Sequence, residues 1–329
     1  MLGVFVAATN QSPQTPAIVA SNVVEKSAIT APADPLEAEY QKLLALDDTA
    51  QAEVDKWIRD NQAFVTNGGG VPDVELNRRI EERLKPVRQA YENFIALHPD
   101  HARVRIAYGS FLNDIREEEA AGAQWEKARA LDPKNSAVWN NLANYYGEHG
   151  PVTNAFGYYN QAIALNPEES VYYHNFGTTV YLFRKDAMEY FHLTEPQVFD
   201  KAFNLYSNAF RLDPQNFPLA SDIAQTYYGI QPFRTNDALR AWTNALAIAH
   251  DEIEREGVYL HFARIHLKVG NFAAAHARLN AVTNAMYAEL KKRLTRNLEA
   301  KENPSPVTNA APLGGGEKGG NTSEPPRGP

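Results

Sequence analysis

Apolar residues recur three and four positions apart through most of the chain, which predicts helices along nearly all of it. Between residues 102 and 169 one pattern is written twice. Its first copy ends in Ala121, Trp125, Ala128, Leu131 and Pro133, and the second in Ala155, Tyr159, Ala162, Leu165 and Pro167, each 34 residues on. A fixed period of this size is typical of arrays of paired helices, because one pair cannot bury its apolar faces alone.

Small residues recur where the two helices of a pair must approach each other. They are Gly109, Ala143, Gly177, Ala224 and Ala263 in the first helices, and Ala121, Ala155, Ala202, Ala238 and Ala275 in the second helices. Four positions after each second-helix alanine, on the same helix face, comes a bulky residue. These residues are Trp125, Tyr159, Tyr206, Trp242 and Leu279. We expect them to fill the space between neighbouring pairs.

The period, the small residues and the bulky residues resemble the tetratricopeptide repeat (TPR), a helix–turn–helix unit of 34 residues. The resemblance implies an all-α solenoid of helical hairpins that winds as a right-handed superhelix. About five repeats are expected, at residues 102–135, 136–169, 170–216, 217–250 and 251–282. The repeats are preceded by a helical region at 34–101, either a degenerate repeat or a cap, and followed by a capping helix at 283–302.

The flanking regions give further expectations. Helical spacing from Leu36 to Phe64, interrupted near Asp47 and Asp48, predicts a short and a longer helix, and Asp73 resembles the N-cap of the next helix. The capping helix carries an apolar stripe at Met286, Tyr287, Leu290, Leu294 and Leu298. Segments 1–33 and 303–329, rich in Ser, Thr, Pro or Gly, are expected to be disordered.

The apolar run from Leu2 to Ala8 has two interpretations. It is either the remnant of a secretory signal, which would make the protein exported or periplasmic, or an ordinary chain terminus, which would leave it cytoplasmic. No lysine or arginine precedes the run.

The third repeat is longer than the others. Its closing Pro214 follows Pro167 by 47 residues, so thirteen residues have been added around 181–196, at the tip of the helical pair. Thr194 and Gln197 match a capping box that restarts the second helix. The aromatic residues of this insert, Phe183, Tyr190 and Phe191, either dock a partner or pack back on the array, and we favour packing.

The composition of the chain argues against several classes of function. The chain has 329 residues, a formal net charge of −8 and no cysteine. It therefore lacks thiolate chemistry, and its charge argues against nucleic acid as a partner. Phosphate-loop, nucleophile-elbow and zinc-protease motifs are absent from the sequence. No run of about 18 apolar residues predicts a membrane span. We expect no enzyme activity, cofactor or metal site.

In TPR arrays the first helix of each pair lines the concave side, so the resemblance implies a groove for an extended peptide. The candidate groove residues are Arg103, Asn113, Asn140, Asn141, Asn144, His174, Asn175, Thr178, Tyr181, Asp222, Gln225, Tyr228, His261 and Arg264. Side-chain amides suit such a ligand, because they both donate to and accept from a peptide backbone. Asn141 and Asn175 hold equivalent places, as in an asparagine ladder, but Ala107, Asp222 and His261 interrupt the series.

Another branch of the family clamps a C-terminal carboxylate with a basic pair. Pro218 and Asp222 stand at those two places here, which argues against that ligand. The favoured function is a non-enzymatic scaffold or adaptor for a protein or peptide partner. The alternative is a structural subunit of an envelope or secretion assembly that docks through the insert. The partner and the oligomeric state are left open.

Overall fold

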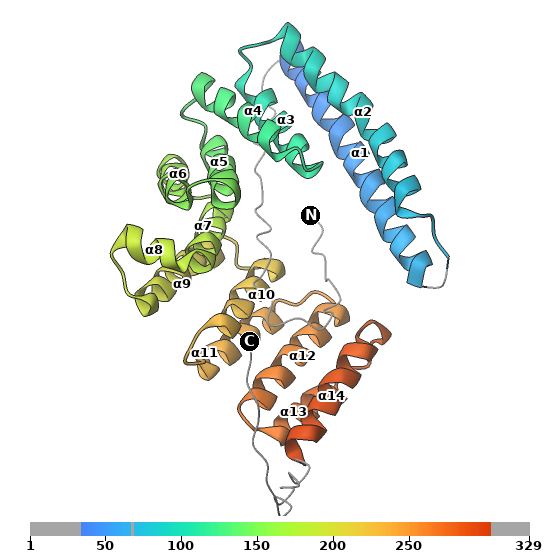
Figure 1. Cartoon of the computed structure of the whole chain (residues 1–329), viewed down its shortest axis with the longest axis vertical. Helices are drawn as coiled ribbons and strands as arrows, with labels where there is room; N and C mark the ends of the chain where they lie inside the picture. Colours follow the sequence, from blue (N-terminus) through green and yellow to red (C-terminus); the bar gives the residue numbers. More distant parts are fainter. Residues whose placement is uncertain (1–33, 67–68, 304–329) are drawn as a thin grey trace, which may run out of the picture. The chain divides into compact units, whose positions relative to one another are not determined.

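The computed structural model describes residues 34–66 and 69–303 (Figure 1). The predicted signal remnant and the predicted tail beyond residue 303 lie outside the described residues. Every regular element in the described ranges is a helix. The chain divides into two compact units, Met1–Arg255 and Glu256–Pro329.

The first unit begins with a hairpin of two long helices, α1 (Pro35–Thr66) and α2 (Asp73–Leu97). The interruption expected near Asp47 was wrong, because α1 runs through it. Asp47 Oδ2 accepts a 2.6 Å hydrogen bond from the Tyr91 hydroxyl of α2. The carboxylate therefore bonds across the hairpin, and does not compete for the backbone of its own helix. Asp73 is the first residue of α2, and the N-cap is Pro72.

Two regular hairpins follow, α3 (Ala102–Asp114) with α4 (Glu118–Leu131), and α5 (Ser136–His149) with α6 (Val152–Leu165). A side chain caps the N-terminus of the first helix in each hairpin, α3 and α5. His101 Nδ1 accepts from the Val104 amide at 3.0 Å, and Asn135 Oδ1 accepts from the Ala137 amide at 3.0 Å. Each bond satisfies an amide that has no partner within its helix.

The third repeat consists of three helices, α7 (Ser170–Leu182), α8 (Arg184–Phe191) and α9 (Glu195–Leu212). The extra residues form α8, which contacts α6, α7 and α9. As the capping box predicts, Gln197 Oε1 accepts from the Thr194 amide at 2.9 Å. The fourth repeat follows as α10 (Phe217–Thr226), the 3-10 turn η1 (Tyr227–Gly229) and α11 (Thr235–Ala247).

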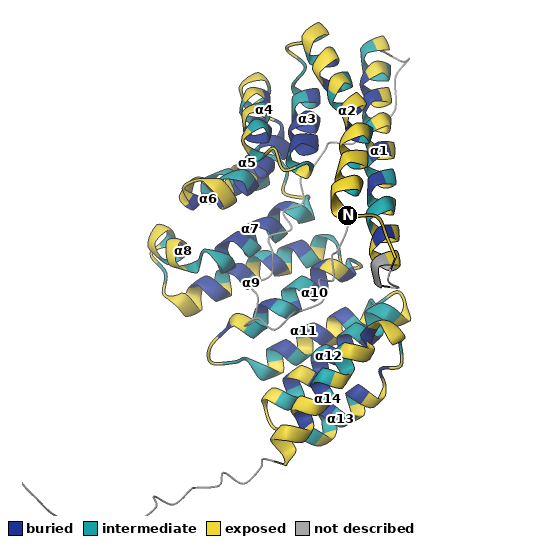
Figure 2. Ribbon diagram, turned by 45° about the vertical axis from the view of Figure 1, so that its right-hand side comes forward, coloured by how far each residue is buried: buried dark blue, intermediate teal, exposed yellow. Residues whose placement is uncertain are grey.

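The five bulky second-helix residues are buried, as predicted. Trp125, Tyr159, Tyr206, Trp242 and Leu279 are each at most 3% exposed. Small first-helix residues make room for them. A Cβ on Gly109 would collide with the Trp125 indole, and a Cβ on Gly177 would lie 2.8 Å from the Tyr206 ring. Figure 2 shows this pattern, with buried residues along the faces where paired helices meet.

The second unit holds most of α12 (Glu252–Lys268), then α13 (Phe272–Asn280), the 3-10 turn η2 (Ala285–Tyr287) and α14 (Ala288–Glu302). Within the predicted stripe Tyr287, Leu294 and Leu298 are buried and Leu290 is partly exposed. Met286 is 66% exposed, so its assignment to the stripe was wrong. It lies in η2, where three residues per turn replace the 3.6 of the α-helix and change the face it occupies.

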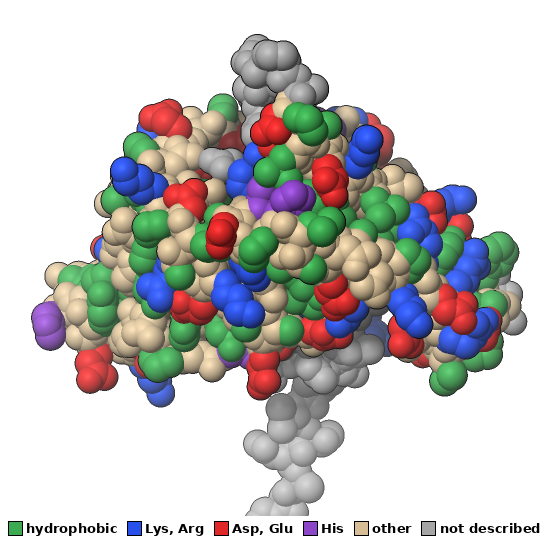
Figure 3. All heavy atoms as spheres, turned by 90° about the horizontal axis from the view of Figure 1, so that it is seen from above, with side chains coloured by type: hydrophobic (Ala, Val, Ile, Leu, Met, Phe, Trp, Pro, Cys, Tyr) green, Lys and Arg blue, Asp and Glu red, His purple; other side chains and the backbone are tan. Residues whose placement is uncertain are grey.

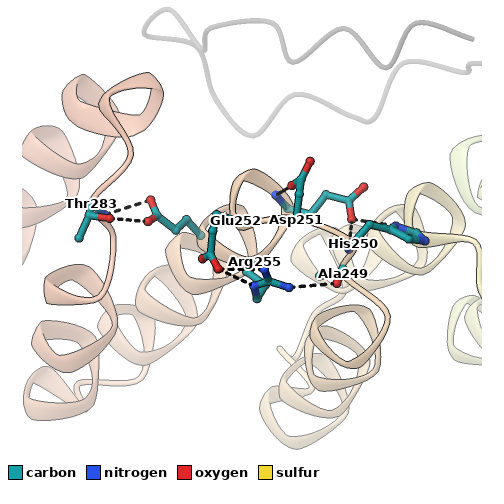
Figure 4. A network of polar contacts seen from close by, with 8 residues as sticks. Ala249, His250, Asp251, Glu252, Arg255 and Thr283 are labelled. Carbon is teal, nitrogen blue, oxygen red and sulfur yellow. Dashed lines mark hydrogen bonds and ion pairs between the residues drawn. The ribbon is translucent and has the colours of Figure 1, made fainter.

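A buried carboxylate holds the connection after α13. Glu256 accepts from the Thr283 amide at 3.0 Å, the Thr283 hydroxyl at 2.8 Å and the Asn284 amide at 2.7 Å. Figure 4 shows the bonds to Thr283 as dashed lines. Burial alone would raise the pKa of Glu256, but the bonds from Asn284 and Thr283 outweigh it and lower the pKa. None of the helices in the described ranges has the length and hydropathy of a membrane span.

Candidate partner-binding surface

Polar side chains of three successive first helices are linked in the first unit. Asn140 on α5 donates to Asn141 Oδ1 at 3.2 Å, and Asn175 on α7 donates to Asn140 Oδ1 at 3.1 Å. Beside Asn175, His174 Nε2 lies 3.6 Å from Asp222 Oδ2 on α10. We call these five residues the first-helix polar strip. It brings together residues that the sequence places 35 and 48 positions apart, 140 to 175 and 174 to 222.

The two ends of the strip differ in exposure. Asn140 and Asn141 are 0% exposed and Asn175 is 3% exposed. The side chains of His174 and Asp222 are 18% and 46% exposed. The strip therefore has a buried amide end and an ionisable end that reaches the surface. Buried amides of this kind fix the relative positions of the helices that carry them, because breaking their bonds costs free energy.

Burial sets the charge of the ionisable end. It lowers the pKa of His174 to about 4 and raises the pKa of Asp222 to about 6. At pH 7 the imidazole is therefore neutral and the carboxylate is ionised. The His174 ring also lies near the Tyr206 ring, with centroids 5.9 Å apart.

Buried tyrosine hydroxyls form a second set of polar links, which the sequence interpretation missed. Tyr159 OH donates to Asn144 Oδ1 at 2.7 Å and lies 3.0 Å from Thr179 Oγ1. Tyr206 OH lies 3.2 Å from Thr178 Oγ1. The signal was present in the sequence, because tyrosine replaces tryptophan at these two positions and brings a hydroxyl that needs a partner when buried.

The other candidate groove residues are not members of the strip. Arg103 Nη1 pairs with Glu37 Oε2 at 2.8 Å, and its guanidinium lies 4.6 Å from the Tyr40 ring centroid, so it joins α3 to α1. Tyr181 is buried, and Asn113, Gln225 and Tyr228 are partly exposed. His261 and Arg264 belong to the second unit, where burial, with a smaller contribution from Arg264, lowers the pKa of His261 to about 3.

Two of the three aromatic residues of the insert pack on the array. Phe183 and Phe191 are partly buried against the core of the third repeat, and the Phe191 ring lies 5.2 Å from that of Phe156 on α6. Lys201 on α9 lies 4.2 Å from the Phe191 ring centroid. Tyr190 also contacts Phe156 but is 42% exposed. The preference for packing thus holds for Phe183 and Phe191, and Tyr190 is the aromatic residue of the insert that reaches the surface.

Charged side chains of both signs are interspersed on the face that Figure 3 shows. This face presents a mixed field, whereas broad phosphate-binding surfaces are basic. In the described part of the chain, no group of three or more His, Asp or Glu side chains is arranged to hold a metal ion.

The chain was compared with protein families, with other proteins and with solved structures. No family model matches the chain. The protein O-mannosyl-transferase TMTC3 of Homo sapiens is 31% identical over 97 residues, which make up 29% of this chain and only 11% of that protein. Among solved structures, PilW, described as a widely conserved type IV pilus biogenesis factor, has a TM-score of 0.50 at 13% identity over 70% of this chain and 96% of its own.

Two further solved structures are similar. PilF of Pseudomonas aeruginosa has a TM-score of 0.48 at 16% identity over 77% of this chain and 97% of its own. YrrB, described as a TPR protein with an unusual peptide-binding site, has a TM-score of 0.46 at 16% identity over 65% of this chain and 99% of its own. The chain has a TPR-like fold. At these identities the likeness of the chain to these structures concerns the fold alone.

Proposed function

We propose that this TPR solenoid is a non-enzymatic scaffold that holds an extended protein segment along the first-helix polar strip. The observation that carries the proposal is the linkage of three first helices: Asn140 bonds to Asn175 between α5 and α7, and His174 contacts Asp222 between α7 and α10. One row of linked polar side chains thus continues from repeat to repeat and reaches the surface at His174 and Asp222, which supports a site for an extended segment.

The two ends of the strip have different roles in this proposal. The buried asparagines fix the spacing of α5 and α7, and so position the first-helix face along which the segment lies. The partly exposed side chains of His174, Asp222 and Gln225 make the first contacts with the partner. A rigid buried row with an accessible end lowers the entropy that binding must overcome.

Quantitative pull-down tests the proposal. Affinity purification of the full chain with mass spectrometry first defines its partners. Recovery of these partners is then compared for the double variant Asn141→Ala/Asn175→Ala. The matched control is Asn160→Ala/Asn208→Ala, because these second-helix asparagines donate to backbone oxygens of their own helices, those of Phe156 and Asn204.

We expect the strip variant to lose at least about tenfold in partner recovery, equivalent to about 1.4 kcal/mol or more, while the control keeps its partners. Thermal melting of both variants separates lost binding from lost folding, since removal of buried amides also destabilises the array. A folded strip variant with full partner recovery would remove the strip from the proposed function.

The alternative, docking of an assembly through the insert, is supported by the exposure of Tyr190. Deleting the insert would be a poor test, because Phe183 and Phe191 pack against the core. The variant Tyr190→Ala, added to the same pull-down, removes the exposed ring alone. Loss of partners in Tyr190→Ala, with full recovery in the strip variant, would favour this alternative.

A further inference from the structure

The charge of the strip is concentrated on one residue. Asp222 lies on α10, and its carboxylate is close to half exposed. Among the described residues, the ion-pair partner of Asp222 is His174, at 3.6 Å. Burial lowers the pKa of His174 to about 4, so the imidazole carries no positive charge near pH 7 and does not balance the carboxylate.

The surroundings of Asp222 also suit the stem of a long basic side chain. The His174 ring lies beside the Tyr206 ring, and Tyr206 OH contacts Thr178 on α7. On α10, Gln225 Nε2 lies 3.4 Å from the Oγ of Ser221, which is one helical turn earlier in the same helix. Tyr206 itself is buried, so the groups that a bound side chain can reach are the carboxylate of Asp222 and the partly exposed, neutral side chains of His174 and Gln225. Such a surface favours a side chain with an apolar stem and a cationic end.

Resting on the proposed function, we propose that Asp222 makes the strip selective for a segment that places a lysine or arginine opposite α10. The carboxylate then pairs with the cation of the bound segment, since its ion-pair partner among the described residues is the neutral His174. This selectivity is opposite in sign to that of a site that captures carboxylates. A partly exposed pair of this kind gives a preference of roughly three- to tenfold.

Defined peptide pools test the inference on the full chain. Each pool contains fluorescently labelled eleven-residue peptides, acetylated and amidated at the ends, with a fixed central Lys, Arg, Gln or Glu and uncharged residues elsewhere. Fluorescence anisotropy gives the affinity of each pool. We expect the Lys and Arg pools to bind best, the Glu pool worst, and the preference to weaken with salt.

Two substitutions of Asp222 test whether this residue determines the preference. Asp222→Asn should bring the Lys and Arg pools to the affinity of the Gln pool, and Asp222→Lys should reverse the order so that the Glu pool binds best. The control Asp186→Asn changes the net charge equally on the exposed surface of α8, and should leave the preference intact.

Each other outcome contradicts a different claim. Pools that bind the wild-type chain with equal affinity, or a Lys preference that survives in both Asp222 variants, would overturn the role of Asp222 but leave the scaffold proposal standing. Absence of binding by every pool, together with full partner recovery in the strip variant of the pull-down, would overturn the scaffold proposal itself.

Discussion

At the scale of single residues, each helical pair closes around a contact between a small residue and a large one. The Trp125 indole occupies the space where a side chain on Gly109 would lie, and its Nε1 donates to the Ile106 oxygen at 3.1 Å. Gly147 differs, because a Cβ there would meet only Thr179 and Ala155 atoms at 3.7 Å or more. Two buried helical glycines of neighbouring hairpins thus differ in the space that surrounds them.

This difference predicts opposite effects of one substitution. Gly109→Ala should destabilise the first unit by about 1 to 3 kcal/mol, because the new methyl group displaces the indole. Gly147→Ala should be neutral or stabilising by up to about 1 kcal/mol, because alanine favours the helix. Urea unfolding followed by circular dichroism measures both. Equal destabilisation by the two substitutions would show that the close approach at Gly109 has no special role.

Such contacts could be predicted from the sequence, but the burial of the asparagines could not. The 34-residue period identifies the positions of Trp125 and Tyr159 because it reports which face of a helix turns towards its neighbour. It does not report that Asn140 accepts a hydrogen bond from Asn175 of the next repeat. Periodicity thus gave the face of the strip residues, whereas their exposure depends on contacts between repeats.

At the scale of elements, connections are fixed by polar bonds that the hydrophobic pattern does not show. The residues next to Asp47 in the sequence predict an interruption of the helix. Its hydrogen bond, however, joins α1 to Tyr91 of α2, a contact that local sequence does not show. Glu256 likewise bonds to residues 27 and 28 positions away. Helix identity is therefore readable from local spacing, while continuity and the geometry of connections depend on distant residues.

The Glu256 connection gives a prediction for the second unit. Glu256→Ala removes the acceptor for two amides and a hydroxyl, and should cost about 1 to 3 kcal/mol through the unsatisfied donors. The folded-state pKa is lowered, so the stabilisation is present above the unfolded value of 4.5 and is lost as pH falls through the folded value.

Chemical unfolding at pH 7 and at successively lower pH measures both effects, with Glu252→Ala as the control. Glu252 is 70% exposed on the same helix and pairs with Arg255 on the surface. The difference in stability between wild type and Glu256→Ala should shrink below about pH 4.5, within the titration range of a carboxylate. A difference independent of pH would show that the charge of Glu256 does not hold the connection.

At the scale of the whole molecule, the first unit is a row of hairpins in which contacts run mainly between neighbours. The hairpin α5–α6 contacts α4 on one side and α7 on the other, whereas the hairpin α1–α2 contacts the array on one side, through α3. In a linear array, stability is approximately the sum of each hairpin and its interfaces. Hairpins with two interfaces should therefore open least often.

Hydrogen exchange followed by mass spectrometry tests this order. Amides of α5, α6 and α7 should exchange most slowly in the first unit, and those of α1 should exchange faster because fewer interfaces hold it. The variant Gly109→Ala should speed exchange in α3 and α4 more than in α9. Uniform exchange rates along the first unit would contradict nearest-neighbour stabilisation and indicate one fully cooperative block.

The inserted helix α8 has a consequence for how such chains are counted. Although the third repeat spans 47 residues, Gly177 still meets the Tyr206 ring as Gly109 meets Trp125. New sequence can thus accumulate between the two helices of a hairpin while the hairpin keeps its place in the row. Dividing the distance between closing prolines by the 34-residue period would therefore overcount the stacked hairpins, and the pairing of a glycine with an aromatic ring marks each hairpin more dependably.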